Sequence, residues 1–233
     1  MAESLPVVLI PGLLCSARLY ASQIPALWST GPVMVAEHTR DDSMAGIARR
    51  ILATAPPRFA LVGLSMGGYI SFELLRQAPQ RVVRLALLDT AARPDTAEAT
   101  AGRRTQMALA SNGRFEEVID ALYPRLVHAS RGEDDALREL NRQMGRETGV
   151  SGYLNQQAAN IARPDSRPTL AAIRCPTLVL VGDADQLTPP DRAEEIANGV
   201  RGAKLLVVPR CGHLSTLEQP EAVTAALLRL LQD

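Results

Sequence analysis

A serine flanked by glycines stands where an apolar run ends and a helical pattern begins. The segment Phe59–Leu75 reads FALVGLSMGGYISFELL, with Gly63, Ser65 and Gly67 at its centre. In a strand–turn–helix segment of this kind the serine is held in a strained conformation that projects its hydroxyl above the sheet edge. Such a nucleophile elbow predicts covalent catalysis by Ser65. The alternative is an ordinary glycine-rich turn with an idle serine.

A serine hydroxyl needs a base to accept its proton as it attacks, and three histidines could serve. His38 lies in the charged segment EHTRDD and is expected at the surface or in a loop, and His128 lies among helical patterns. His213 directly follows the last strand-like run. Loops at the carboxyl ends of parallel strands share one edge of a sheet, so His213 and Ser65 are predicted to meet there.

An acid should orient the imidazole and stabilise its cationic form. Asp183 and Asp185 follow the fifth apolar run, in LVGDADQLTPP, and Asp89 follows the fourth run. All three reach the same predicted edge. Each could instead cap a helix or a turn, so the spacing alone leaves the acid open.

Six short apolar runs alternate with helical patterns and predict the scaffold. The runs are Pro6–Ile10, Val33–Ala36, Phe59–Gly63, Val83–Leu88, Thr177–Gly182 and Lys204–Pro209. They are apolar throughout rather than alternating, which is typical of strands covered on both faces of a parallel sheet. We therefore expect an α/β fold with helices on both faces.

One long interval breaks this alternation. Between the fourth and fifth runs lie more than eighty residues without a strand-like run. Phe115–Leu126, Asp134–Gly145 and Gly152–Ala162 are predicted as amphipathic helices, and Tyr123 and Tyr153 as packing residues within them. The small, polar segment around Thr96 is expected to be a mobile loop. This pattern indicates a helical insertion.

Composition limits the class of protein. The chain has 233 residues, 46% of them apolar, with 25 basic and 25 acidic residues. The balanced charge favours neither nucleic acid nor an anionic membrane surface as a partner. Cys15, Cys175 and Cys211 are too few and too scattered for a disulfide framework or a zinc site, which suits a reducing cytoplasm. The N-terminal apolar run lacks the preceding positive charge of an export signal.

The chain resembles the α/β-hydrolases over nearly its full length. VVLIPGLL corresponds to the oxyanion strand and turn, GLSMGG to the elbow, PTLVLVGDAD to the acid loop and CGHLSTLEQPEAV to the segment around the histidine. The order Ser65, Asp, His213 is that family's order. The resemblance implies Asp185 as the acid, with Asp89 as its main rival. It is greatest to the carboxylesterase and 3-oxoadipate enol-lactonase branches.

The resemblance also implies a domain organisation. Residues 1–92 and 167–233 would form the hydrolase core, and residues 93–166 a helical cap inserted after the fourth strand. Since only five residues precede the first run, the family's usual N-terminal hairpin is expected to be absent, leaving six parallel strands.

The oxyanion turn departs from the usual pattern. The family commonly begins this turn with His-Gly, whereas this chain has Pro11-Gly12. The backbone N–H groups of Met66 and Leu13 are expected to form the oxyanion hole, with Leu14 as the alternative to Leu13.

These features together predict a serine hydrolase that needs no cofactor or metal and cleaves a carboxylic ester or lactone through an acyl-enzyme. Its partner would be a small-molecule substrate rather than a nucleic acid or a membrane. Acyl transfer, perhydrolysis or C–C bond hydrolysis on the same triad are the enzymatic alternatives. A small-molecule receptor of the same fold is the alternative outside enzymes.

Overall fold

The computed structural model describes residues 4–232. Six strands form one sheet in the order β2-β1-β3-β4-β5-β6, and all neighbours are parallel. The strands are β1 (Val7–Ile10), β2 (Val33–Val35), β3 (Phe59–Leu64), β4 (Val82–Leu88), β5 (Thr177–Gly182) and β6 (Lys204–Val208). This confirms the predicted six-stranded parallel sheet and the α/β-hydrolase fold class.

Helices connect the strands. Within residues 4–232 they are α1 (Ile24–Trp28), α2 (Met44–Thr54), α3 (Met66–Gln77), α4 (Ala97–Ser111), α5 (Phe115–Leu126), α6 (Asp135–Ile161), α7 (Arg167–Leu170), α8 (Pro190–Gly199), α9 (Ser215–Glu218) and α10 (Pro220–Gln232). Short 3-10 turns span Ala17–Tyr20, Pro79–Arg81 and Ala129–Arg131. None of the described helices is both long and apolar enough to cross a bilayer.

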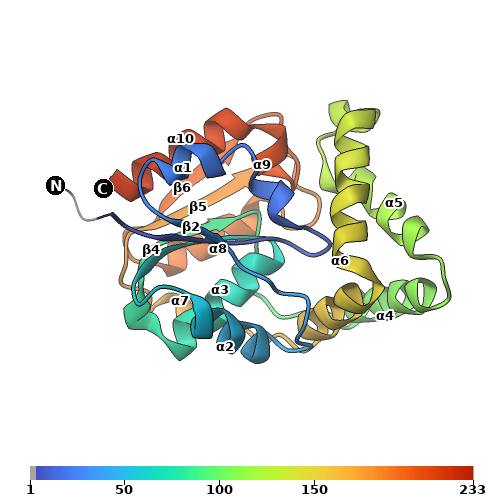
Figure 1. Cartoon of the computed structure of the whole chain (residues 1–233), viewed down its shortest axis with the longest axis horizontal. Coiled ribbons are helices and arrows are strands. Elements are labelled where there is room, and N and C mark those ends of the chain that lie inside the picture. Colours follow the sequence, from blue (N-terminus) through green and yellow to red (C-terminus); the bar gives the residue numbers. More distant parts are fainter. Residues whose placement is uncertain (1–3, 233) are drawn as a thin grey trace.

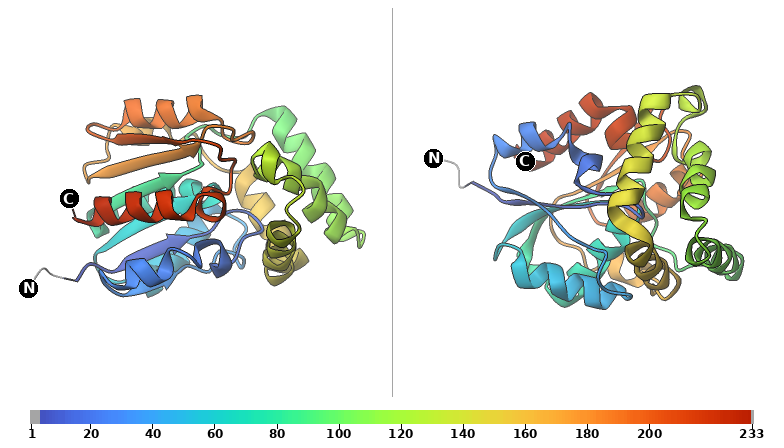
Figure 2. Two further views of the ribbon diagram at one scale, coloured as in Figure 1. Left: turned by 90° about the horizontal axis from the view of Figure 1, so that it is seen from above. Right: turned by 45° about the vertical axis from the view of Figure 1, so that its right-hand side comes forward.

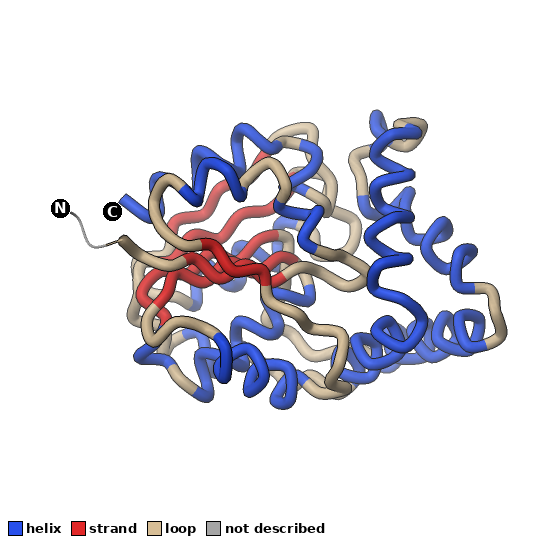
Figure 3. Tube along the Cα trace, in the orientation of Figure 1, coloured by secondary structure: helices blue, strands red, loops and turns tan. Residues whose placement is uncertain are grey.

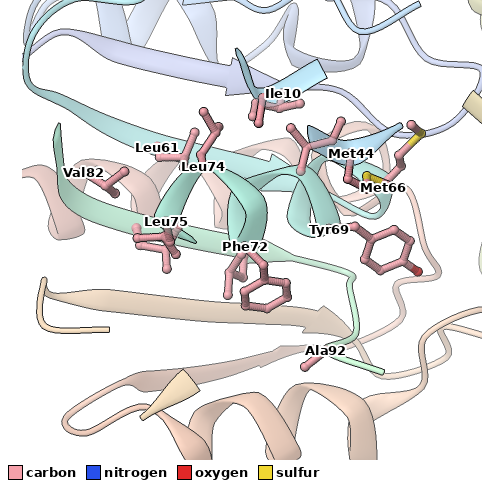
Figure 4. Packing of buried hydrophobic residues seen from close by; sticks show 14 of the residues in the cluster. Ile10, Met44, Leu61, Met66, Tyr69, Phe72, Leu74, Leu75, Val82 and Ala92 are labelled. Carbon is pink, nitrogen blue, oxygen red and sulfur yellow. The ribbon is translucent and has the colours of Figure 1, made fainter. Parts of the chain in front are cut away.

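The sheet is buried between two helical layers because successive strand residues point to opposite faces. Val8 and Ile10 belong to the hydrophobic cluster that includes residues of α2, α3 and α8, whereas Val7 and Leu9 belong to the cluster that includes α10. Figure 1 shows α1 and α10 on one side of the sheet and α2 and α3 on the other. Figure 4 shows the α3 side of this core, where Phe72 and Leu75 lie against the strands.

The helices α4, α5 and α6 form a separate group beyond one end of the sheet. They lie between β4 and β5 in the chain, and Figure 2 shows them past the carboxyl ends of the strands. Figure 3 shows that this part of the molecule contains helices and loops, while both described chain ends lie at the opposite side. The group therefore covers the edge at which the site residues were expected.

One prediction about this region was wrong, whereas the expected break between the two helices of residues 134–162 is present as a kink. The expected loop around Thr96 is the start of a helix: the Thr96 side chain accepts a hydrogen bond from Ala99 N and α4 runs from Ala97 to Ser111. This side-chain cap stabilises the first turn despite the small, polar sequence. The two expected helices from Asp134 to Ala162 are assigned as one element, α6, with a kink at Gly149 (φ 70°, ψ 166°). A positive φ is least costly for glycine.

Candidate active site

The turn between β3 and α3 holds Ser65 in a strained conformation. Ser65 has φ 55° and ψ −114°, an unusual conformation for a residue with a Cβ. The flanking glycines are required by close contact: a Cβ on Gly63 would lie 2.3 Å from Gly67 O, and one on Gly67 would lie 2.1 Å from Ile10 O. The segments can approach one another this closely only because neither position carries a side chain.

Hydrogen bonds from β4 and the residues after it hold the strained turn. Ser65 N donates to Leu88 O at 2.9 Å, and Thr90 Oγ1 donates to Ser65 O at 2.7 Å. The neighbouring Gly68 leaves room for Thr90, because a Cβ there would lie 2.3 Å from Thr90 Oγ1. The backbone of Ser65 is thus fixed from two sides, so its strained conformation is held by the surrounding structure.

His213 is paired with Asp185 at the same edge of the sheet. His213 Nδ1 lies 2.7 Å from Asp185 Oδ2, and both side chains are buried. The other carboxylate oxygen, Oδ1, accepts from Leu187 N at 2.8 Å and Thr188 N at 3.0 Å, and Thr188 Oγ1 donates to Oδ2 at 2.8 Å. A carboxylate oxygen can only accept a hydrogen bond, so the imidazole carries its proton on Nδ1. Nε2 is then unprotonated and can act as a base.

The pair shifts both ionisation equilibria. Burial opposes charge on His213, but the negative charge and the hydrogen bond of Asp185 offset it, so the pKa of His213 is raised. Burial likewise opposes ionisation of Asp185, yet His213 and the hydrogen bonds from Thr188 hold the pKa of Asp185 below its ordinary value. The carboxylate therefore remains ionised beside an imidazole that readily accepts a proton.

The two other candidate acids bind elsewhere. Asp89 is fully buried; its Oδ1 accepts from Gly182 N at 3.0 Å and its Oδ2 from Ser215 Oγ. Burial and the nearby charge of Asp185 raise the pKa of Asp89. Asp183 is exposed and accepts from Cys211 N at 3.1 Å. Neither makes a hydrogen bond to His213 in the described structure.

The other two histidines are not in this pair. His128 follows α5 and caps a short turn by accepting from Ser130 N. His38 was expected at the surface or in a loop: it lies in a loop after β2 but not at the surface, since it is only 3% exposed, with Nε2 3.0 Å from Gly12 O. Burial lowers the pKa of His38, although the contact with the Gly12 carbonyl opposes this. His38 is therefore a neutral ring packed behind the turn at Gly12.

Two backbone N–H groups of that turn, those of Gly12 and Leu13, donate no hydrogen bond within residues 4–232. Cys15 N donates to Gly12 O at 3.2 Å, which closes the turn, and Leu14 N donates to the side-chain oxygen of Gln156 at 3.1 Å. Leu13 N makes no hydrogen bond within residues 4–232, and neither does Met66 N at the start of α3. Of the two alternatives, Leu14 N–H is thus already occupied and Leu13 N–H is not.

Ser65, His213 and this turn line one cavity of about 630 Å³. The insertion supplies part of its wall, with residues from α4, α5 and α6 that include Gln106, Ile119, Leu122, Leu126, Asn141 and Asn160. The lining is mixed rather than largely apolar. Its charged members are Arg93, Asp95, Glu98, Arg103, Arg125, Arg163 and Arg192. A concave site with both apolar and polar groups is suited to binding a small molecule. Among the described residues, no group of three or more His, Cys, Asp or Glu side chains could hold a metal ion.

Comparison with known proteins identifies the family of this chain. A model of the alpha/beta hydrolase family matches residues 7–226. The chain belongs to the alpha/beta hydrolase family. Among solved structures, a thermophilic esterase from Thermogutta terrifontis is 31% identical to this chain, with a TM-score of 0.89 over 98% of this chain and 89% of that one.

Two further proteins have lower sequence identity to this chain. The enol-lactonase from Burkholderia xenovorans has a TM-score of 0.89 and 24% identity, covering 100% of this chain and 93% of that one, which shows the shared fold. The 2-hydroxy-6-oxononadienedioate/2-hydroxy-6-oxononatrienedioate hydrolase of Escherichia coli is 26% identical over 211 residues, 88% of this chain and 73% of that enzyme.

The pocket of this alpha/beta hydrolase was only partly predictable from its sequence. Of the aromatic residues singled out in the insertion, Tyr123 and Tyr153 are buried in packing, as predicted, and do not line the cavity. The wall residues Leu122 and Asn141 were not anticipated, because an apolar or amide side chain on an amphipathic helix carries no signal for a pocket. Gln156 was missed for the same reason.

Proposed function

We propose that this alpha/beta hydrolase is a serine hydrolase acting on a carboxylic ester or lactone. The observation that carries the proposal is the buried His213–Asp185 pair, whose histidine lines one cavity with a serine held in a strained turn. The likeness to the Thermogutta terrifontis esterase supports an ester as the substrate class.

In the proposed reaction Ser65 Oγ attacks the carbonyl carbon while His213 Nε2 takes the hydroxyl proton. The carbonyl π electrons move onto oxygen, then return to re-form the double bond as the bond to the leaving oxygen breaks. The leaving oxygen takes the proton from His213. Water then attacks the acyl-enzyme by the same steps, releasing the acid and restoring Ser65.

The developing oxyanion would be bound by Leu13 N–H and Met66 N–H. Both donors are left without an acceptor in the described structure, which is how an oxyanion hole is preorganised. Met66 also begins α3, so the positive end of the helix dipole favours negative charge at the same point. Asp185 would hold the imidazole and stabilise its cationic form.

Hydrolysis of a C–C bond is the second candidate. The Escherichia coli relative is named for a substrate with two carboxyl groups, a hydroxyl and a ketone, and no ester. Hydrolysis of such a molecule must break a bond to carbon. The same Ser65–His213–Asp185 arrangement could perform it if the departing carbon were stabilised as an enolate.

We further propose that residues 93–166 act as a cap that selects the substrate. Side chains from α4, α5 and α6 line the cavity opposite Ser65, so they would contact the acyl or alcohol group rather than the reacting bond. The hydrolase core, residues 1–92 and 167–233, would then supply the chemistry.

The test compares the wild type with Ser65→Ala on nitrophenyl esters, small lactones and vinylogous ketones. Ser65→Ala should abolish turnover, because triad removal costs on the order of 10⁴- to 10⁶-fold. Ser111→Ala, at an exposed position that ends α4, is the control and should retain wild-type rates. Turnover by Ser65→Ala above a tenth of wild type would refute the serine mechanism, and ketone cleavage without ester cleavage would favour the second candidate.

A further inference from the structure

A buried amide of the insertion makes direct contact with the oxyanion turn. Gln156, on α6, is completely buried, and its Oε1 accepts a hydrogen bond from Leu14 N at 3.1 Å. Its Nε2 lies 3.1 Å from His38 Nε2. His38 Nε2 also lies 3.0 Å from Gly12 O. Because a carbonyl oxygen only accepts, this ring nitrogen carries a proton and does not accept from the Gln156 amide.

The turn itself is in a conformation that its sequence does not favour. Leu14 has φ 58°, in the left-handed region, at the third position of the turn that Cys15 N closes onto Gly12 O. Glycine or asparagine is preferred at such a position, and a leucine there is strained. Strained residues persist where surrounding contacts hold them, and here Gln156 holds the Leu14 N–H.

The contact sets the direction of the peptide next to the proposed oxyanion donor. The hydrogen bond from Leu14 N–H to Gln156 fixes the peptide plane between Leu13 and Leu14. Leu13 N–H belongs to the neighbouring peptide, on the other side of Leu13 Cα. Because Cys15 N–H closes the turn onto Gly12 O, a rotation of that plane would require the Gly12–Leu13 peptide, which carries Leu13 N–H, to adjust as well. The geometry required of an oxyanion donor is narrow, so such a displacement would reduce the stabilisation of the transition state.

The second half of α6 is attached to the same region by other contacts. Asn155 Nδ2 donates to Thr39 O at 2.9 Å, next to His38. Before the Gly149 kink, Glu147 accepts from Ser16 Oγ at 2.6 Å, just after the turn. The helix α6 therefore contacts the oxyanion turn and the His38 loop on both sides of its kink.

We propose that Gln156 is a positioning residue for the oxyanion hole, so that the insertion helps to assemble the catalytic geometry as well as the pocket. This inference rests on the proposed function. It gives α6 a role in the rate of the chemical step, which is distinct from the choice of substrate.

The variant Gln156→Leu removes the amide at nearly constant volume. Loss of a whole oxyanion donor costs about 10²–10³-fold in kcat, so misplacement of one should lower kcat by about 10–100-fold. KM should change by less than about threefold, because the neutral ground-state ester does not depend on the oxyanion hole. Gln156→Glu keeps an oxygen that can accept from Leu14 N–H and should recover most of the lost kcat.

Gln157→Leu is the matched control. Gln157 is the next residue on α6 and is equally buried, but its side chain bonds to Tyr153 and Arg103 rather than to the turn. Thermal melts of both variants measure how much the loss of a buried amide lowers the stability of the fold. A boronic acid that forms a tetrahedral adduct with Ser65 supplies a second readout: its Ki should rise in Gln156→Leu in parallel with the fall in kcat.

The outcomes separate the two proposals. A drop in kcat and in boronic acid affinity for Gln156→Leu, with Gln157→Leu close to wild type, supports the positioning role. Equal kcat values for the two leucine variants, or a change confined to KM, would overturn it while leaving the serine hydrolase intact. Absence of Ser65-dependent turnover in the wild type would instead overturn the proposed function and this inference together.

Discussion

Replacing Asp185 with asparagine tests the assignment of the acid, and the structure specifies the orientation of the new amide. Leu187 N and Thr188 N both donate to Asp185 Oδ1, so the asparagine oxygen should occupy that position. The NH₂ group would then replace Oδ2 and face His213 Nδ1, which lies 2.7 Å from Oδ2. An NH₂ group only donates, so Nδ1 would have to accept, and the proton would move to Nε2.

His213 Nε2 would then already carry a proton and could not accept one from Ser65. We expect a fall in kcat of about 10⁴-fold, equivalent to about 5.4 kcal/mol of activation free energy. The comparison variant is Asp89→Asn: Asp89 bonds to Gly182 N and Ser215 rather than to His213, so its loss should be below about tenfold. Steady-state ester hydrolysis measures both, with thermal melts to confirm folding. A mild effect of Asp185→Asn beside a severe effect of Asp89→Asn would refute this reasoning.

Three further predictions follow from the same geometry. Because the pKa of His213 is raised and only its neutral form accepts a proton, the acidic limb of the kcat/KM profile should lie above about pH 6.5; a limb near pH 5 would contradict this. Gly67→Ala should lower the free energy of unfolding by about 1–3 kcal/mol in urea titrations, since its Cβ would lie 2.1 Å from the carbonyl oxygen that ends β1. Gly102→Ala, whose Cβ would meet nothing within 4 Å, is its control, and equal stabilities would refute the packing argument. Leu122→Ala should enlarge the cavity and favour longer acyl chains, whereas Leu140→Ala, outside the cavity, should not; identical chain-length profiles would contradict a selective cap.

Much of the fold could be predicted from the sequence because its signals are local. Each apolar run became a strand of the parallel sheet to within a residue or two, and Phe115–Leu126 became α5 with the predicted bounds. Ser65 could be located because its turn requires Gly63 and Gly67 on either side, and the contacts of those glycines explain why. Local patterns of this kind are independent of the rest of the chain.

The contacts around the site were harder to predict because they join distant segments. The link from Gln156 to Leu14 spans 142 positions and has no local pattern, and the burial of His38 depends on α6 lying against its loop. The choice between Leu13 and Leu14 likewise depended on where one distant amide points. Spacing also could not separate Asp89 from Asp185, because both end buried strands at the same edge and differ only in which side chain each one meets.

The measurement that tests the central claim most directly is identification of the residue that a fluorophosphonate modifies. We expect one adduct per chain, located on Ser65 by peptide mass spectrometry, and we expect Ser65→Ala to lose it. Labelling should also slow strongly in Asp185→Asn, since the same base activates the serine. An adduct on any other residue, or ester hydrolysis by an enzyme that takes up no label, would contradict the account.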